Sequence, residues 1–203
     1  MKEIILLLSL FIFFLSAKLN AQQSNTSYGI QAGMNYSRYT PRFPEPEVEG
    51  FRYAGIIGFY AGGFVNFEIN EKLKIQPSLI FAFQGSKFIF ENIKYRNVDF
   101  NFSAKVVEST IIIPVAVQNY LSKKFYIEAG PQIGYTISTR GTFDDGTASE
   151  TIMNNDKLDF GFFAGMGYQL NKYFTLNSKY LIGIIKRRDI KTAVLNIGIE
   201  YRF

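Results

Sequence analysis

Charged side chains are the main candidates for chemistry in this sequence, because its 203 residues include no histidine and no cysteine. Histidine is the commonest general base near neutral pH, and several hydrolytic mechanisms pair it with serine or aspartate. Those mechanisms lose their usual base here. The sequence therefore predicts no catalytic residues, no bound cofactor and no enzymatic activity.

Metal binding has only weak candidates. The runs Asp144-Asp145-Gly146 and Asn154-Asn155-Asp156 are rich in oxygen ligands. Neither run has the alternating ligands and distal glutamate of a calcium loop, and turn formation explains both compositions. The sequence predicts no metal site.

Seven charges fall at alternating positions on the polar faces of segments whose opposite faces are apolar. If those segments are strands, the charges share one side of a sheet. Charges at membrane depth are costly and often functional, so they could form a proton or ion path. The alternative is that they pair across strands and fill a narrow interior. The seven residues are Glu68, Lys74, Glu108, Glu128, Lys179, Glu200 and Arg202.

A second cluster is basic and lies in a predicted loop at 185 to 192. Arginine presents a fork of donors that suits phosphate, so the cluster could contact the phosphates of lipopolysaccharide. The alternative is an ordinary solvated loop. Its members are Lys186, Arg187, Arg188 and Lys191.

The N-terminal segment predicts a secretory signal peptide. Lys2 precedes an apolar run from Ile4 to Leu15, and small residues lead up to Ala21. Twelve helical residues span about 18 Å, less than the roughly 30 Å of a bilayer core, so a spanning helix is disfavoured. We expect cleavage after Ala21, with residues 1–21 as the signal peptide and residues 22–203 as one domain.

Strict alternation of apolar with polar or small residues recurs along the remaining chain and predicts strands. It is clearest at the C-terminus, where Leu195, Ile197 and Ile199 share one face with Tyr201 and Phe203. The predicted strands cover about 28 to 38, 57 to 69, 73 to 83, 106 to 120, 125 to 138, 158 to 170, 174 to 184 and 193 to 203.

The connections alternate between short turns and long loops. Similar short turns follow Ile69, Leu121 and Leu170, whereas about 39 to 54, 85 to 104, 139 to 157 and 185 to 192 read as loops. This alternation is typical of an up-and-down barrel in the bacterial outer membrane. The fold class we expect is all-β, an eight-stranded antiparallel transmembrane β-barrel preceded by a cleaved signal peptide.

A soluble barrel of the lipocalin type is the competing architecture, with its apolar side chains inside. The polar faces decide between the two, because they carry many glycines, such as Gly130, Gly134 and Gly165. A narrow lumen needs small residues, whereas a solvent-exposed face does not. The large aliphatic and aromatic faces suit lipid. Tyr201 and the terminal Phe203 also look like the signal that the outer-membrane insertion machinery reads.

Several segments carry a family resemblance. They are Gly58 to Gly62, Leu73 to Leu79 with Gln76-Pro77, Ile113-Pro114, Glu128 to Tyr135, and Gly198 to Phe203. Together they resemble the PorT-like outer-membrane β-barrel family, small barrels of the OmpA and OmpX type. The Glu-Ala-Gly-Pro-Gln-Ile-Gly-Tyr stretch is the most specific part. The resemblance implies the fold and the outer membrane, and its namesake is associated with a protein secretion and maturation system.

Three functions follow as alternatives. The first is a structural or partner-binding component, an accessory of a secretion or envelope complex whose protein partner the sequence does not identify. The second is a narrow channel for ions or small solutes, and the third is a lipid-modifying enzyme, which the missing histidine disfavours. Outer-membrane lipid and lipopolysaccharide are expected surroundings. The net charge of +5 is scattered, so no nucleic-acid partner is expected.

Overall fold

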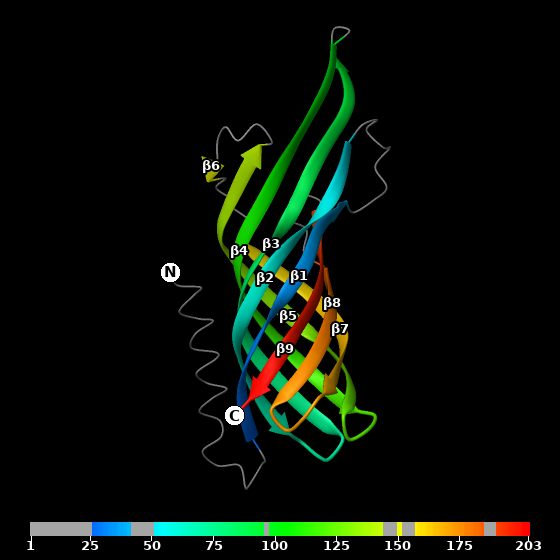
Figure 1. Ribbon diagram of the computed structural model, residues 1–203. Helices are drawn as coiled ribbons and strands as arrows, with labels where there is room; N and C mark the ends of the chain where they lie inside the picture. The colour runs from blue at the N-terminus through cyan, green and yellow to red at the C-terminus, as the bar shows by residue number, and fades with distance from the viewer. Residues whose placement is uncertain (1–25, 42–50, 96–97, 144–149, 152–156, 185–189) are drawn as a thin grey trace.

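The strands form one continuous antiparallel ring (Figure 1). The computed structural model describes residues 26–41, 51–95, 98–143, 150–151, 157–184 and 190–203, so the predicted signal peptide lies outside the described residues. The strands are β1 (Thr26–Pro41), β2 (Phe51–Glu68), β3 (Leu73–Tyr95), β4 (Val98–Tyr120), β5 (Phe125–Phe143), β6 (Glu150–Thr151), β7 (Leu158–Gln169), β8 (Phe174–Gly183) and β9 (Ile190–Arg202).

The first and last strands close the ring. β1 pairs with β2 on one side and with β9 on the other, so Gly33 is opposite both Tyr60 and Gly198. β6 lies outside this ring, because its two residues pair only with β5 at Arg140 and Gly141. The prediction of an eight-stranded antiparallel barrel is therefore confirmed, with β6 as an addition at one end.

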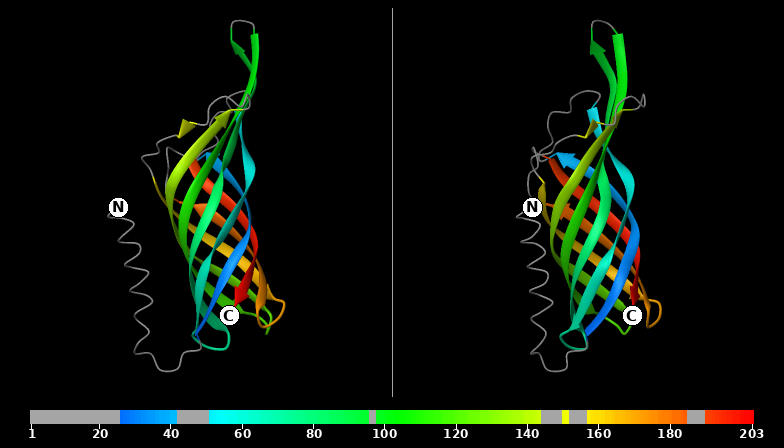
Figure 2. Two further views of the ribbon diagram at one scale, coloured as in Figure 1. Left: turned by 60° about the vertical axis from the view of Figure 1, so that its left-hand side comes forward. Right: turned by 90° about the vertical axis from the view of Figure 1, so that its left-hand side faces the viewer.

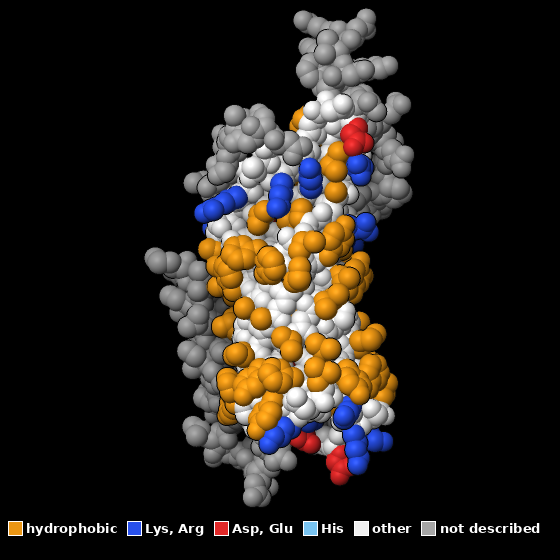
Figure 3. Space-filling model, in the orientation of Figure 1, with side chains coloured by type: hydrophobic (Ala, Val, Ile, Leu, Met, Phe, Trp, Pro, Cys, Tyr) orange, Lys and Arg blue, Asp and Glu red, His pale blue; other side chains and the backbone are white. Residues whose placement is uncertain are grey.

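The two faces of the wall are opposite to those of a soluble protein. Outward side chains are large and apolar, such as Ile57, Phe59 and Ile197, each at least 60% exposed. Inward side chains include polar residues that are almost fully buried, among them Gln76 and Gln118. On the face shown in Figure 3, the hydrophobic side chains gather in an upper and a lower band, with charged side chains beyond them. The outward face is thus suited to lipid, as the sequence predicted.

The three short turns share one stabilising device. Oδ1 of Asn70 accepts hydrogen bonds from the backbone N–H groups of Lys72 and Leu73, both at 2.9 Å. Asn171 and Ser122 repeat this arrangement in the other two turns. Side chains that bond the backbone two or three residues ahead favour tight turns. These turns lie at one end of the barrel, the turn end; the opposite end is called the loop end.

One predicted loop is instead a hairpin, and the expectation for residues 85 to 104 was wrong. β3 and β4 remain paired from Leu73↔Asn119 to Tyr95↔Val98, and the hairpin extends past the other strands (Figures 1 and 2). β1, β2 and β5 also reach into the predicted loops at 39 to 54 and 139 to 157. The reason is cross-strand pairing of aromatic rings at the loop end, which stabilises strands that the mixed local sequence does not reveal.

A bulge between β2 and β3 is stabilised by β1. The register shifts between Gly55 and Tyr60, which leaves backbone groups of β3 without their strand partner. Oγ of Ser37 accepts a hydrogen bond from the N–H of Gly85 at 2.7 Å, and Nδ2 of Asn35 donates to the carbonyl of Phe83 at 3.0 Å. Buried backbone groups need such partners. Lumen side chains therefore replace the missing ladder bonds.

Glycines make room for aromatic rings in the narrow lumen. A Cβ atom on Gly167 would lie 2.2 Å from Cζ of Tyr126, and one on Gly198 would lie 2.1 Å from the hydroxyl oxygen of Tyr60. Real Cβ atoms do not approach other atoms so closely. Gly167 and Gly198 are thus positions over which tyrosine rings lie.

Candidate functional site

Lys179 is the centre of the main charged cluster. It projects from β8 into the lumen, with its Nζ 3.1 Å from Oε1 of Glu128 on β5 and 3.7 Å from Oε1 of Glu200 on β9. The side chains of the two glutamates are only 0% and 3% exposed. The three strands therefore place one cation between two buried carboxylates, and we call these residues the lysine triad.

Amide side chains complete the hydrogen bonding of the lysine triad. Nε2 of Gln76 and Nδ2 of Asn177 donate to Oε1 of Glu200 at 3.1 and 2.9 Å. Nε2 of Gln118 donates to Oε2 of Glu128 at 3.1 Å and also to Gln76. Buried charges are tolerated only when they are paired and hydrogen-bonded. The network stabilises both carboxylates in place.

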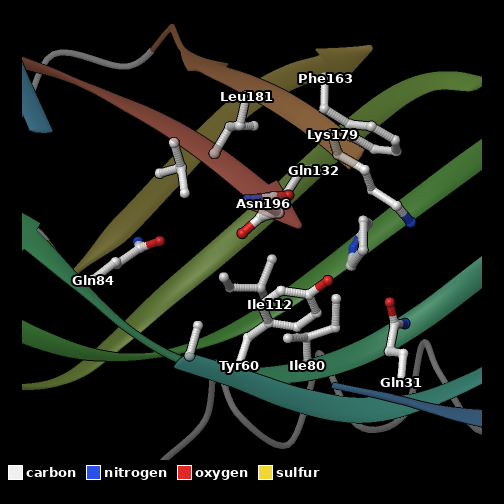
Figure 4. A pocket seen from close by; sticks show the side chains of 13 residues that line it. Gln31, Tyr60, Ile80, Gln84, Ile112, Gln132, Phe163, Lys179, Leu181 and Asn196 are labelled. Carbon is white, nitrogen blue, oxygen red and sulfur yellow. The ribbon is translucent and has the colours of Figure 1, made fainter. Parts of the chain in front are cut away.

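An apolar layer lies beside the triad toward the loop end. Two buried clusters form it, from Ala116, Phe163, Leu181 and Val194 and from Tyr60, Ala82 and Ile112. Figure 4 shows four of them, Tyr60, Ile112, Phe163 and Leu181, around a cavity that Lys179 and Gln31 also line. The cavity measures about 20 Å³, room for roughly one water molecule. Side chains fill the lumen at this level.

The remaining predicted lumen charges do not join the triad. Glu68 and Lys74 pair with each other at 3.4 Å beside a turn, where both are partly exposed. Glu108 is buried but lies ten residues along β4 from Gln118, about 33 Å of extended chain away. Arg202 lies near the turn end and interacts with Tyr120. The structure thus brings together three of the seven.

The predicted phosphate cluster is mostly outside the described residues, because Lys186, Arg187 and Arg188 fall there. Lys191 is described and belongs to β9 instead of a loop, with its carbonyl accepting a hydrogen bond from Oγ1 of Thr40 at 3.3 Å. Whether the four residues act together stays a prediction.

The predicted insertion signal lies at the end of β9. The Tyr201 ring lies 5.1 Å from that of Phe174 and 5.5 Å from that of Phe203. Phe203 is 72% exposed, and its N–H donates to the carbonyl of Tyr28 at 2.9 Å. These residues form an aromatic group on the outward face at the turn end. Its recognition by an insertion machinery stays a prediction.

An aromatic cluster at the loop end was missed by sequence reasoning. The Phe90 and Phe102 rings stack at 4.3 Å across β3 and β4, and Phe51 lies 4.7 Å from Phe90. Tyr53 and Phe88 extend the cluster at 5.2 Å. The alternation of Phe88 and Phe90 was the available signal, but the intervening charges and asparagines obscured it.

The lumen and the loop end differ in what they can do. The triad is a set of ion pairs in which amide side chains also donate hydrogen bonds to both carboxylates, so it is suited to holding the barrel together. In the part of the chain that the structure describes, no group of three or more acidic side chains is placed to hold a metal ion. No described helix is long and apolar enough to cross a membrane, a finding that does not concern β-barrels. Among the described strands, β3 and β4 extend beyond their neighbours β2 and β5 (Figure 1).

Comparison with known proteins identifies one family and several solved structures of similar fold. The model of the outer membrane protein beta-barrel domain matches residues 20–187. Ail, the attachment invasion locus protein of Yersinia pestis, solved with the heparin analogue sucrose octasulfate, is 16% identical with a TM-score of 0.50, over 88% of this chain and 99% of that chain. A comparison with curated proteins gives no match.

Two further solved structures are similar at lower scores. Neisserial surface protein A is 14% identical over 88% of this chain and 99% of its own, with a TM-score of 0.48. OprG from Pseudomonas aeruginosa is 13% identical over 89% and 97%, with a TM-score of 0.46. At such identities the likeness concerns the fold alone.

Proposed function

The chain belongs to the outer membrane protein beta-barrel domain family and lies in the bacterial outer membrane, and from this premise we propose that it binds another envelope protein through its β3–β4 hairpin. Outer-membrane barrels have short periplasmic turns and longer extracellular segments. The turn end therefore faces the periplasm, and the hairpin faces the cell exterior.

The observation that carries the proposal is the part of the hairpin that extends beyond the neighbouring strands. Past Phe90, the described part of β3 pairs only with β4, and past Ala104 toward the tip, β4 pairs only with β3. Both outer edges there extend beyond the neighbouring strands β2 and β5. Such edges accept an added strand from a partner, with aromatic side chains supplying further contacts.

The finer assignment follows from the family resemblance. We propose that the chain is a PorT-like accessory of a secretion or envelope complex, since the segments Glu128 to Tyr135 and Gly198 to Phe203 resemble that family. In this role the barrel is an anchor, and the hairpin is the binding element.

A photocrosslinking experiment in native membranes tests the proposal. A photoreactive amino acid at exposed Asn101 on the hairpin should give a crosslink to one protein, whereas the same group at Ile57, on the lipid face, should not. Shortening the hairpin by matched deletions in β3 and β4 should abolish copurification of that protein while the barrel still folds. Recovery of lipid alone from both positions would contradict the proposal.

The two alternatives have less support. A channel needs a continuous aqueous path. The apolar layer instead fills the lumen beside the triad and leaves a cavity of only about 20 Å³. A lipid-modifying enzyme would lack its usual base, because the chain has no histidine. We propose that the protein is not an enzyme. Changed lipid A mass spectra on deletion or overexpression would contradict this.

A further inference from the structure

Three neighbouring strands of the wall carry prolines that lie close together. Pro77 on β3 is paired with Val115 on β4, and the register between β4 and β5 places Pro131 opposite Val115 on its other side. Pro114 directly precedes Val115. Proline has no backbone N–H, so sheets normally restrict it to edge strands or bulges. A closed barrel has no edge strands, and these prolines therefore stand in the middle of a paired wall.

The strand pairing is interrupted at these prolines. Between β4 and β5 it stops at Pro114↔Gln132 and resumes at Val117↔Ala129. The positions between include Pro131, which has no N–H to donate to β4. The ladder between β3 and β4 has a similar interruption at Pro114. Backbone groups without partners are costly in lipid, so the wall is weakened here.

The outer side of the β4–β5 interruption faces lipid. Pro131 is exposed and is paired with Phe162 on β7, which is 52% exposed on the outward face. Val117 and Ile127 lie on the same face toward the turn end, and each is 44% exposed. Large apolar side chains on the outward face of a barrel contact acyl chains. The interruption therefore lies within the hydrocarbon region.

The inner side of the interruption borders the cavity in the apolar layer. Pro114 and its cross-strand partner Gln132 both line this cavity, together with Ile80 and Ile112. Figure 4 shows Gln132, Ile80 and Ile112 around it. The wall is a single layer of strands, so the interrupted ladder alone separates the cavity from lipid. A volume of about 20 Å³ accommodates a group about the size of a water molecule or a methyl group.

The lining of the cavity indicates its occupant. Most of the side chains around it are apolar, among them Phe163, Leu181 and Val194. Ligand sites are typically apolar cavities with a few polar groups, and this one lies beside a weakened wall that faces lipid. We propose that the end of one acyl chain of a membrane lipid enters between β4 and β5 at Pro131 and occupies the cavity. The site is in the wall and does not involve the hairpin, so this proposal and the proposed function can fail separately.

Photocrosslinking in vesicles tests the proposal. The barrel is reconstituted with a phospholipid that carries a diazirine at the terminal carbon of one acyl chain, and the labelled residues are mapped by mass spectrometry. We expect labelling of inward Ile112 as well as outward Phe162. Variant P131V should reduce labelling of Ile112 about tenfold, because valine supplies the missing ladder donor, and should leave labelling of Phe162 unchanged. The matched control I133V, at a normally paired position of β5, should behave like the unchanged protein.

A second variant closes the site from the inside. Ala82 lines the cavity and is only 2% exposed, so A82L should fill it and abolish the inward labelling while Phe162 is still labelled. Labelling confined to outward residues in the unchanged protein would overturn the proposal, and this is the result that a water molecule in the cavity predicts. Inward labelling that persists undiminished in P131V would also overturn it. Heat-modifiable migration on gels would verify that each variant is folded.

Discussion

Lys179 illustrates how a single residue can be indispensable without adding much stability overall. Removing charges from water costs several kcal/mol per ion, and ion pairing compensates for that cost only in good geometry. Here the cation is shared by two carboxylates that also accept amide hydrogen bonds. Its loss would leave an uncompensated pair of like charges in the lumen.

Substitution of Lys179 by methionine should therefore destabilise the barrel strongly. We expect the free energy of unfolding to fall by about 3 to 5 kcal/mol, since Glu128 and Glu200 would remain buried and unpaired. Urea titration of the barrel in lipid vesicles measures this. The triple variant K179M/E128Q/E200Q should recover much of the loss, and K124M in a turn should change little. An equally large loss in the triple variant would contradict the ion-pair explanation.

A side chain at Gly167 should destabilise the barrel. A methyl group there would lie 2.2 Å from the Tyr126 ring, so G167A should cost about 1 to 3 kcal/mol of unfolding free energy. Gly63 is the matched control, because its nearest neighbour is 3.7 Å away. In a double-mutant cycle, G167A should cost less in a Y126L background. Additive effects would show that the ring is not the cause.

The sequence predicted which residues face the lumen but not which of them meet. Alternation alone assigned Glu128, Lys179 and Glu200 to the inner face, and the structure places them together. It also assigned Glu108, which lies at another level. The level of a side chain along the barrel axis depends on the tilt and stagger of the strands, which no local sequence pattern encodes. The apolar layer was missed for the same reason, since its members are spread over six strands.

At the scale of elements, the strands near the turn end were predicted closely, whereas those near the loop end were predicted too short. The turns at Asn70, Ser122 and Asn171 carry a local signal, because each side chain bonds its own backbone. The hairpin carries no such signal near Phe90. Its pairing depends on the ring of Phe102, a partner on another strand.

The β2–β3 bulge gives a prediction at this scale. S37A removes the acceptor for the Gly85 N–H, which would become a buried orphan donor, at a cost of about 1 to 3 kcal/mol. Ser27, on the same face of β1, is the control position. Hydrogen exchange measures the effect, and the Gly85 amide should lose protection more than amides in β7. Uniform loss throughout the barrel would contradict a local role.

For the whole molecule, the filled lumen predicts that the barrel does not conduct ions. Planar-bilayer recording of the purified barrel should show no steady conductance, because Phe163 and Tyr60 help close the lumen. A variant with both replaced by alanine should conduct if that layer is the barrier. Steady conductance in the unchanged protein would instead support the channel alternative.

Phe203 should matter for assembly in cells more than for the finished barrel. Its ring is 72% exposed and lies near only that of Tyr201 among the ring pairs described. F203A should therefore refold into pure lipid vesicles at a normal rate but accumulate less in the outer membrane of living cells. Equal slowing in both settings would show a role in folding itself instead of recognition.

The pairing of β1 with β9 sets a condition on the timing of biosynthesis. Thirteen consecutive β1 positions, from Gly29 to Pro41, pair with residues 190 to 202, so the ring cannot close before β9 has been synthesised. Until then the chain carries two unsatisfied edges, which invite aggregation. We therefore expect the unclosed chain to need protection from aggregation before it reaches the outer membrane. A chain that stopped before β9 would leave β1 without this partner strand.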